Sequence, residues 1–324
     1  MIQTTIKRRD NVTARFAERR QPNTSALVAL PSNLGAIEAG MRFANGANPF
    51  IAILGSSGWG KTHLLESVRS FMVSKGIGVG EPVAATKYAS SPECVDEALP
   101  LLLDDVQDAH RNLRTRHELR RLLEQRVRLH RATMVAFSDE CSQKQVCGFL
   151  PCRQVWGIQT IVVPSADERR LVVRQIAAKE GVLLSRPLER LVSKHLFGNG
   201  RSILGAVLTL KHVRSDWSDR HGACEACGLL MPYIHGENGW DPRDVVVEAV
   251  SQNRLSEVTC QQVSAYLLLA VFGLSEYDTA TFLGESPSKV YTMANGVKRR
   301  LDDPRLRSCV EQCQETVVTM FESD

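Results

Sequence analysis

Two features that would place a protein in a membrane or secreted class are missing from this sequence. The longest apolar run, Ala265 to Leu274, is too short to cross a bilayer, so no membrane role is indicated. The nine cysteines are odd in number and scattered, and no apolar segment near the start resembles a secretory signal. We therefore expect a reduced, cytoplasmic protein.

Net charge is small overall but unevenly distributed. The 324 residues carry a formal charge of only +4, and 43% hydrophobic with 23% charged residues is ordinary for a globular chain long enough for two domains. Residues 1–20 hold six Lys/Arg against two acids, whereas residues 241–324 hold eight against thirteen Asp/Glu, a net charge of −5. We expect residues 1–25 to form a basic flexible arm that binds anionic partners, or a solvated tail.

The most informative stretch is PFIAILGSSGWGKTHLLESV, residues 49–68. It fills the phosphate-loop pattern G-x-x-x-x-G-K-[ST], between an apolar run expected to form a strand and a helical pattern that begins near Lys61. Lys61 is expected between the β- and γ-phosphates of ATP, and the Thr62 hydroxyl on Mg²⁺. The alternative is a glycine-rich connector that matches by chance. The residues expected to bind ATP or ADP are Gly55, Ser56, Ser57, Gly58, Trp59, Gly60, Lys61, Thr62 and His63.

A second apolar run, ALPLLLDD at residues 98–105, ends in paired carboxylates. It is typical of a Walker B strand, which we expect to adjoin the strand of the phosphate loop. Because the carboxyl ends of parallel strands face the ligand crevice, Asp104 is expected to reach the Mg²⁺ held by Thr62 through a water molecule. Asp105 would then polarise the attacking water. The alternative is a strand end capped by acids.

The remaining patterns are coarser. We expect strands at residues 83–86, 133–139 and 156–163. If the second lies next to the Walker B strand, its end would sit beside the γ-phosphate. Residues 111–131 hold eight arginines around an apolar stripe, which predicts a helix with a polycationic outer face that binds nucleic-acid phosphate or an acidic partner, or is merely solvated. The stripe is Leu119, Leu122, Leu123 and Val127.

Helical patterns dominate from residue 164 onward. Residues 167–180 have Leu171, Val172 and Ile176 on one face of the expected helix, and the helices after residue 242 have the rhythm of a helix-turn-helix. Cys224 and Cys227 have the spacing of zinc ligands, but without a second such pair the sequence leaves a metal site open. Pro31-Ser32-Asn33 precedes a helical pattern, which Ser32 or Asn33 can cap.

Taken in order, these motifs resemble the AAA+ ATPase class and, more narrowly, the bacterial replication initiator DnaA and its relatives. GKTHLLESV resembles that family's GKTHLLHAV, and LLLDDVQ resembles its LLIDDIQ. Residues 137–139 fall where TSD is usual, residues 199–206 resemble NVRELEGA, and residues 152–157 resemble SRFGWG. The resemblance covers residues 27–212 well and residues 241–324 more loosely.

The resemblance implies an α/β fold: a P-loop AAA+ parallel-sheet core (26–163), a helical lid (164–215), a linker (216–240) and a small all-α helix-turn-helix-like domain (241–324). It places Asn33 at the nucleotide base, Asp139 as sensor 1 and Arg201 as sensor 2. It also makes Arg153 an arginine finger that acts in trans on a second copy or another AAA+ protein. A plain surface arginine is the alternative for Arg153.

The sequence departs from the family in three ways. Only 42 residues separate Lys61 from Asp104, too few for the helical insertion that grips single-stranded DNA. Phe149 stands where a second interface arginine is expected, and most DNA-reading residues near the C-terminus are replaced. A basic edge remains as the candidate DNA contact, formed by Lys289, Lys298, Arg299 and Arg300.

The expected function is a DnaA-like switch that binds ATP and hydrolyses it slowly to ADP and phosphate. It would act in DNA replication initiation or its control, by changing assembly and DNA or partner binding. Two alternatives are an Hda-like regulator that stimulates ATP hydrolysis on the initiator, and a DNA-binding or transposition-helper module in which ATP is structural.

Overall fold

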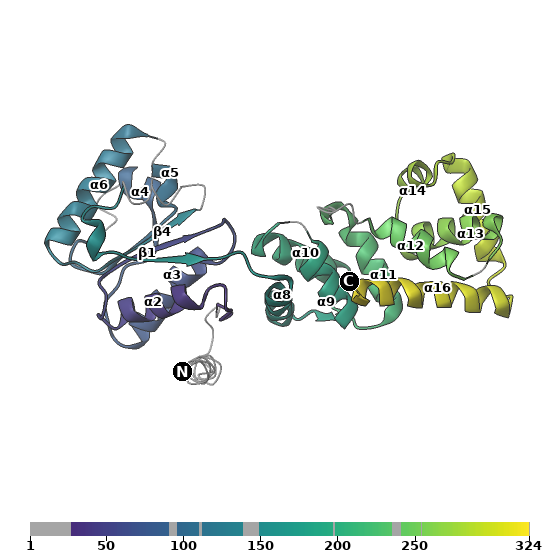
Figure 1. The fold of residues 1–324 in the computed structure, drawn as a ribbon, viewed down its shortest axis with the longest axis horizontal. Coiled ribbons are helices and arrows are strands. Elements are labelled where there is room, and N and C mark those ends of the chain that lie inside the picture. Colours follow the sequence, from purple (N-terminus) through teal and green to yellow (C-terminus); the bar gives the residue numbers. More distant parts are fainter. Residues whose placement is uncertain are drawn as a thin grey trace, which may run out of the picture. The chain divides into compact units, whose positions relative to one another are not determined.

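The structure is a computed structural model that describes residues 27–90, 96–109, 112–138, 149–196, 198–234, 241–253 and 255–323. The chain divides between Glu168 and Arg169 into two compact units, which are described separately below and drawn in Figure 1. Within the described ranges, no helix is both long and apolar enough to span a membrane.

Unit 1 is built on a five-stranded parallel sheet of order β2-β3-β4-β1-β5. Both β1 and β4 are buried along their whole length, as expected for central strands of a parallel sheet whose two faces are covered by helices. The strands are β1 (Phe50–Gly55), β2 (Val83–Ala84), β3 (Leu101–Asp104), β4 (Thr133–Ser138) and β5 (Gly157–Ile161).

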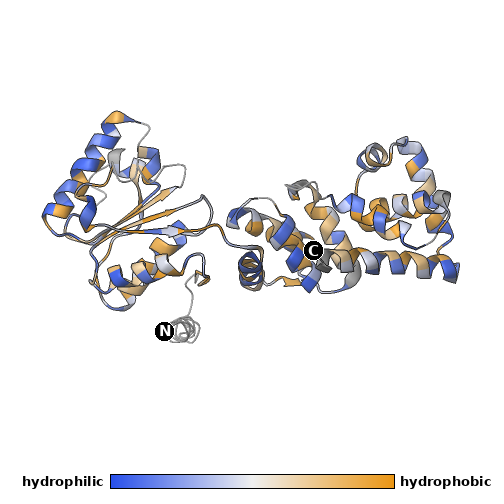
Figure 2. Cartoon of the chain, in the orientation of Figure 1, coloured by the Kyte–Doolittle hydropathy of each residue, from blue (hydrophilic) through white to orange (hydrophobic). Residues whose placement is uncertain are grey.

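Helices cover the two faces of this sheet (Figure 1). One face packs against α2 (Leu34–Ala44) and α3 (Lys61–Ser74), and the other against α4 (Ala85–Ser90), α5 (Val106–Ala109) and α6 (Leu113–Arg128). Side chains alternate along the strands, so Phe50, Ala52 and Leu54 of β1 join the core beneath α6. Figure 2 shows the strands as apolar and much of α6 as hydrophilic. A doubly wound core of the expected class is confirmed.

Two strands are shorter than their sequence patterns predict. Of residues 83–86 only two form β2, because α4 begins at Ala85. Of residues 98–105 only four form β3, because Pro100 lacks the backbone N–H that a strand interior requires. The strand predicted at residues 156–163 is reduced to β5, and both Val162 and Val163 are exposed beyond its end.

Unit 2 is helical apart from the short parallel pair β6 (Leu183–Leu184) and β7 (Asp216–Trp217). The stretch 216–240, expected to be a linker, contains β7, α11 and a 3-10 turn in its described part. The helices are α8 (Ala166–Glu180), which begins in unit 1, α9 (Arg186–His195), α10 (Gly200–Val213), α11 (Arg220–Leu230), α12 (Pro242–Ser251), α13 (Glu257–Tyr266), α14 (Glu276–Leu283), α15 (Pro287–Arg299) and α16 (Pro304–Ser323); short turns lie at η2 (Arg153–Val155) in unit 1 and η3 (Met231–Tyr233), and the π-helix η4 (Leu267–Val271) follows α13.

Packing within unit 2 joins segments that are far apart in the chain. The long helix α16 packs against α9, α11 and α12, so the expected lid helices and the C-terminal helices share one core. In α8 the buried residues are Val173 and Ala177, whereas Leu171, on the apolar face that the spacing indicated, is 46% exposed. The helix-turn-helix rhythm matches α13, α14 and α15, with Ser286 accepting a hydrogen bond from the Lys289 N–H at the start of α15.

Candidate nucleotide-binding site

The glycine-rich loop joins the end of β1 to the start of α3. Gly58 and Gly60 have φ angles of 77° and 94°, a backbone conformation that other residues rarely adopt. A Cβ atom on Gly55 would lie 2.8 Å from the carbonyl oxygen of Ile161, so that position also requires glycine. Because α3 has 14 residues, the loop ends at a helix N-terminus whose unpaired N–H groups favour an anion.

Lys61, the first residue of α3, turns its side chain back over this loop. The side chain is buried, and its Nζ donates hydrogen bonds to the carbonyl oxygens of Gly55 (2.6 Å) and Ser56 (3.0 Å). A buried ammonium is costly unless hydrogen-bond acceptors or an anion compensate its charge. The Lys61 ammonium therefore suits a phosphate bound in the loop.

Thr62 and Asp104 are brought together, although they lie on different elements. The Thr62 Oγ1 donates a 2.6 Å hydrogen bond to Asp104 Oδ2, and Asp104 is 7% exposed at the end of β3. The two strands involved do not adjoin as expected: β4 lies between β1 and β3. The contact therefore spans the end of β4, which itself becomes part of the site.

Asp105 is fixed from two sides, and its second partner was missed from the sequence. Its N–H donates to Asp104 Oδ1 at 2.9 Å, and its Oδ1 accepts a 3.0 Å hydrogen bond from the side-chain Nε2 of Gln107 on α5. The Oε1 of Gln107 accepts from the Ser138 N–H at 2.9 Å. Gln107 is the Q of LLLDDVQ, so the motif contained it, but only the sheet order shows that β4 is within its reach.

The groups at this edge of the sheet fit a magnesium-bound triphosphate. The Ser138 hydroxyl is buried and has no hydrogen-bond partner within the described part of the chain. Thr62, Asp104 and Asp105 offer only oxygen atoms, the ligands that Mg²⁺ prefers. When bound, Mg²⁺ would neutralise phosphate charge, with Thr62 and Asp104 holding it directly or through water.

The segment before α2, where the nucleotide base is expected, is held by side chains. Asn33 is buried and occupies the N-cap position of α2, as predicted, but its side chain makes no capping hydrogen bond. Instead its Oδ1 accepts from the Leu30 N–H at 2.9 Å and its Nδ2 donates to the Val28 carbonyl at 2.8 Å. Asn33 therefore shapes the loop around the expected base position, and direct contact with the base stays a prediction.

Glu168 ties the same segment to the start of α8. Its two carboxylate oxygens accept from the Ser32 N–H (2.7 Å) and the Ser165 N–H (2.8 Å). Burial raises the pKa of Glu168, but the hydrogen bonds from Ser165 and Ser32 outweigh it and hold the pKa below its ordinary value of 4.5.

Arg153 lies on the surface of unit 1, as an arginine that acts on a neighbouring molecule must. It opens the η2 turn and lines a shallow cavity of about 300 Å³ together with Gln154, Trp156 and Ile158. Phe149, found where a second interface arginine was expected, is buried against Phe137 with ring centroids 5.9 Å apart. Phe149 is thus a core residue, and the trans role of Arg153 stays a prediction.

Two further residues predicted for this site are Asp139 and Arg201. Asp139 lies outside the described residues, so its role as sensor 1 stays a prediction. Arg201 is exposed at the first turn of α10 in unit 2, where Asn199 caps the helix by accepting from the Arg201 N–H, and its role as sensor 2 also stays a prediction.

The basic edge expected on α15 is not continuous. Lys289 lies in the first turn of α15 and forms a 2.6 Å ion pair with Glu285. Lys298, Arg299 and Arg300 lie at the other end, about 13 Å further along the helix axis at 1.5 Å per residue. The candidate DNA contact is therefore three exposed cations at the end of α15, and Lys289 is partly neutralised.

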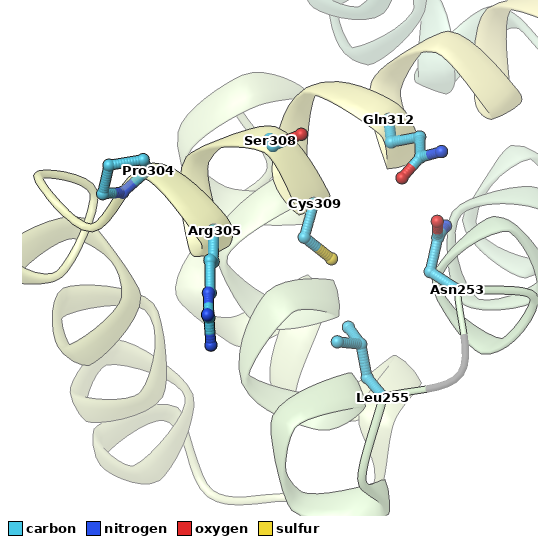
Figure 3. A pocket seen from close by; sticks show the side chains of 7 residues that line it. All are labelled: Asn253, Leu255, Pro304, Arg305, Ser308, Cys309 and Gln312. Atoms are coloured by element: carbon cyan, nitrogen blue, oxygen red, sulfur yellow. The ribbon is translucent and has the colours of Figure 1, made fainter.

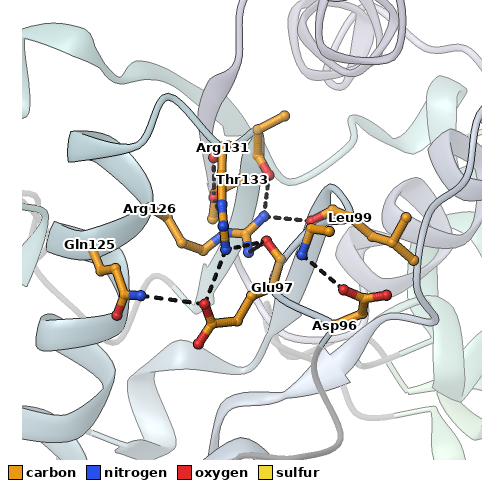
Figure 4. A network of polar contacts seen from close by, with 9 residues as sticks. Asp96, Glu97, Leu99, Gln125, Arg126, Arg131 and Thr133 are labelled. Carbon is orange, nitrogen blue, oxygen red and sulfur yellow. Dashed lines mark hydrogen bonds and ion pairs between the residues drawn. The ribbon is translucent and has the colours of Figure 1, made fainter.

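One of the eight arginines expected on the outer face of α6 lies inside the protein. Arg126 is 2% exposed and donates hydrogen bonds to Thr133 Oγ1 and to the carbonyl oxygens of Glu97, Leu99 and Ala132 (Figure 4). Burial and, to a smaller extent, the nearby charge of Arg131 lower the pKa of Arg126 to about 10. Arg126 thus joins the residues just before β3 to those just before β4. The polycationic face of α6 therefore has one arginine fewer than predicted.

Unit 2 contains a second shallow cavity, of about 430 Å³, between the first half of α16 and the chain after α12. Figure 3 shows Arg305 and Cys309 from α16 facing Leu255 and Asn253. Across the described ranges, no group of three or more His, Cys, Asp or Glu side chains is placed to hold a metal ion.

Cys224 and Cys227, whose spacing is that of zinc ligands, are both buried in α11. Burial raises the pKa of Cys224 to about 12 and that of Cys227 well above its ordinary value. Because a zinc ligand must be a thiolate, these surroundings favour a packing role for both thiols.

Comparison with known proteins gives one consistent result. No protein-family model matches the chain. The chromosomal replication initiator protein DnaA of Nitrosospira multiformis is 26% identical over 196 residues, 53% of this chain and 40% of that protein. DnaA 2 of Chlamydia pneumoniae is 25% identical over 175 residues, 49% of this chain and 39% of that protein. The chain thus spans less than half the length of these curated relatives.

Solved structures agree at the level of the fold. Domain III of Thermotoga maritima DnaA superposes with a TM-score of 0.54 and 22% identity, over 64% of this chain and 94% of that chain. AMPPCP-bound DnaA from Aquifex aeolicus gives 0.50 and 18%, over 90% and 95%. The order of motifs, the parallel sheet and these relatives together show a divergent chain that is similar to DnaA in sequence over about half its length and similar to it in fold.

Proposed function

We propose that this chain binds ATP or ADP with Mg²⁺ at the loop before α3 and acts as a DnaA-like switch in DNA replication initiation or its control. The observation that carries the proposal is the 2.6 Å hydrogen bond between Thr62 and Asp104. It joins a phosphate-loop hydroxyl to a buried carboxylate from another strand, which is the pairing that a bound Mg²⁺ would bridge.

Three further observations support nucleotide binding. The Lys61 ammonium is buried within the loop, and α3 presents its N-terminus there. The Ser138 hydroxyl is buried without a partner among the described residues, as expected for a group that meets a ligand. The Aquifex aeolicus DnaA structure of similar fold contains AMPPCP, an analogue of ATP.

Slow hydrolysis to ADP and phosphate is part of the proposal. Asp105 would accept the proton of the attacking water, and Arg153 of one molecule would stabilise the γ-phosphate charge held by another. Arg153 is exposed and has no ion-pair partner among the described residues, which leaves it available for such a contact. Self-assembly or pairing with another AAA+ protein would then depend on the nucleotide.

DNA binding is the less supported part of the switch. The exposed cations Lys298, Arg299 and Arg300 favour it, whereas residues 241–324 carry a net charge of −5 that opposes it. An Hda-like regulator remains the second candidate, because Arg153 would serve equally well on an initiator as on a copy of this chain. Acceleration of ATP hydrolysis on a purified DnaA, lost in Arg153→Ala, would favour that candidate.

The decisive experiment is nucleotide affinity in matched lysine variants. We expect Lys61→Ala to weaken ATP binding about a hundredfold, because a charge-assisted contact to phosphate is lost. Lys75→Ala is the control: Lys75 ends the same helix, is exposed and donates to Asn45 at 2.9 Å. Titration with a fluorescent ATP analogue, with and without Mg²⁺, measures both. Unchanged affinity in Lys61→Ala would refute the proposed site.

A further inference from the structure

The Gln107 side chain contacts both Asp105, which follows β3, and Ser138, the last residue of β4. It lies on α5, half-buried, with its Nε2 on Asp105 and its Oε1 on the backbone N–H of Ser138. A side-chain amide has a donor end and an acceptor end, and here a carboxylate needs the donor while an N–H needs the acceptor. The two contacts therefore allow only one orientation of the amide.

We infer that Gln107 is a positioning residue for ATP hydrolysis that aims the Asp105 carboxylate at the attacking water; the inference rests on the proposed function. Asp105 has a φ angle of 50°, a conformation that residues other than glycine rarely adopt. Its N–H is held by Asp104 and its Oδ1 by Gln107. Both the backbone and the side chain of Asp105 are thus fixed before any substrate binds.

The arrangement leaves one oxygen of Asp105 for chemistry. Oδ1 is occupied by Gln107, and Oδ2 has no hydrogen-bond partner among the residues described. In hydrolysis the water oxygen forms a bond to the γ-phosphorus, and the bond from that phosphorus to the β,γ-bridging oxygen breaks. ADP leaves with the electron pair, and the water proton passes to Asp105 Oδ2 and then to solvent. Gln107 thus never contacts the reacting atoms but decides where Oδ2 points.

The hydrogen bond between Gln107 and the Ser138 N–H links the orientation of Asp105 to β4, the strand between β1 and β3. Ser138 is the last residue of β4, which lies between β1 and β3 in the sheet. Because Gln107 holds the Ser138 N–H, a shift of this strand end would move the amide and turn Asp105 with it. The end of β4 and the orientation of the Asp105 carboxylate are therefore coupled through one side chain.

Two variants of Gln107 separate its two contacts. Gln107→Met keeps the length of the side chain and loses both hydrogen bonds, whereas Gln107→Glu keeps an acceptor for Ser138 but cannot donate to Asp105. The control is Gln125→Met, because Gln125 also donates to a carboxylate, Glu97, at 3.3 Å, but far from the loop. The measurements are ATP affinity, kcat and KM for hydrolysis, and hydrogen exchange of the Ser138 amide.

We expect kcat to fall about tenfold or more in both Gln107 variants, with ATP affinity within about twofold of wild type, because only orientation for the chemical step is lost. Exchange at Ser138 should accelerate in Gln107→Met and not in Gln107→Glu. The Gln125→Met variant should resemble wild type in every measurement.

Several results would overturn the inference. An unchanged kcat in Gln107→Met would do so, and so would full activity in Gln107→Glu, since the Asp105 contact would then not matter. A wild-type chain that binds ATP but never hydrolyses it would overturn this inference and leave nucleotide binding intact. A wild-type chain that does not bind ATP would instead refute the proposed function itself.

Discussion

The two units of the chain differ in what they bury. Every buried charged side chain in the described structure lies in unit 1, namely Lys61, Asp104 and Arg126. Among the described residues of unit 2, the buried polar side chains all bear a hydroxyl group: Ser193, Ser264 and Thr279. Burying a charge costs free energy unless it is paired and hydrogen-bonded. Unit 1 thus buries charges at the candidate nucleotide-binding site and at the Arg126 hydrogen-bond network, whereas the described part of unit 2 is held by apolar helix packing.

The largest expected effect on stability comes from removing the buried Arg126 side chain of unit 1. Arg126→Ala should destabilise unit 1 by about 4 kcal/mol, because the carbonyl oxygens of Leu99 and Ala132 lose their buried donor. Arg120→Ala is the control, since the Arg120–Glu124 pair is exposed and should cost no more than about 0.5 kcal/mol. Hydrogen exchange measured by mass spectrometry assigns the loss to a unit. Equal effects of the two variants would contradict this stabilising role of Arg126.

A glycine pair tests unit 2 in the same way. A Cβ on Gly228 of α11 would collide with the backbone carbonyl of Phe272, so Gly228→Ala should cost about 3 kcal/mol. Gly296 of α15 has open space around it, so Gly296→Ala should stabilise by about 0.5–1 kcal/mol through helix propensity. Denaturation midpoints measure both. A Gly228→Ala variant as stable as wild type would show that the close approach of α11 to Phe272 does not contribute to the stability of unit 2.

Glu168 offers the smallest and most local test. Its folded pKa is lower than its unfolded value of 4.5, so its contribution to stability is present above pH 4.5 and is lost as the pH falls through the folded pKa. Protection of the Ser32 amide from hydrogen exchange should therefore drop on acidification. In Glu168→Gln the protection should be lower at neutral pH, by less than about 1 kcal/mol, and almost independent of pH. A wild-type profile that matched the variant would argue against this contact.

The sequence predicted the site best where a motif is local. The loop from β1 into α3 and the paired carboxylates at the end of β3 follow from patterns within a few residues, and the structure shows Thr62 and Asp104 in contact. Gln107 could not be predicted, because its partner Ser138 is 31 residues away and becomes a neighbour only through the sheet order. The pairing of strands is a long-range property that no short pattern contains.

Helical spacing explains two other differences. Arg126 lies three residues after Leu123 and so on the buried face of α6. It was expected on the outer face because arginine is a charged residue, although its spacing indicated the buried face. Cys224 and Cys227 are also three apart, which puts both on one face of a helix as readily as it suits a metal ion. The same spacing serves packing and ligation, and only the surroundings distinguish them.

The position of α16 has a consequence for the order in which the chain folds. Its partner α9 comes more than 100 residues earlier, so the core that they share cannot close until residues 304–323 have left the ribosome. The sheet of unit 1 is complete by Glu168 and needs nothing made later. During synthesis the loop between β1 and α3 can therefore fold before α16 is available to complete the core of unit 2.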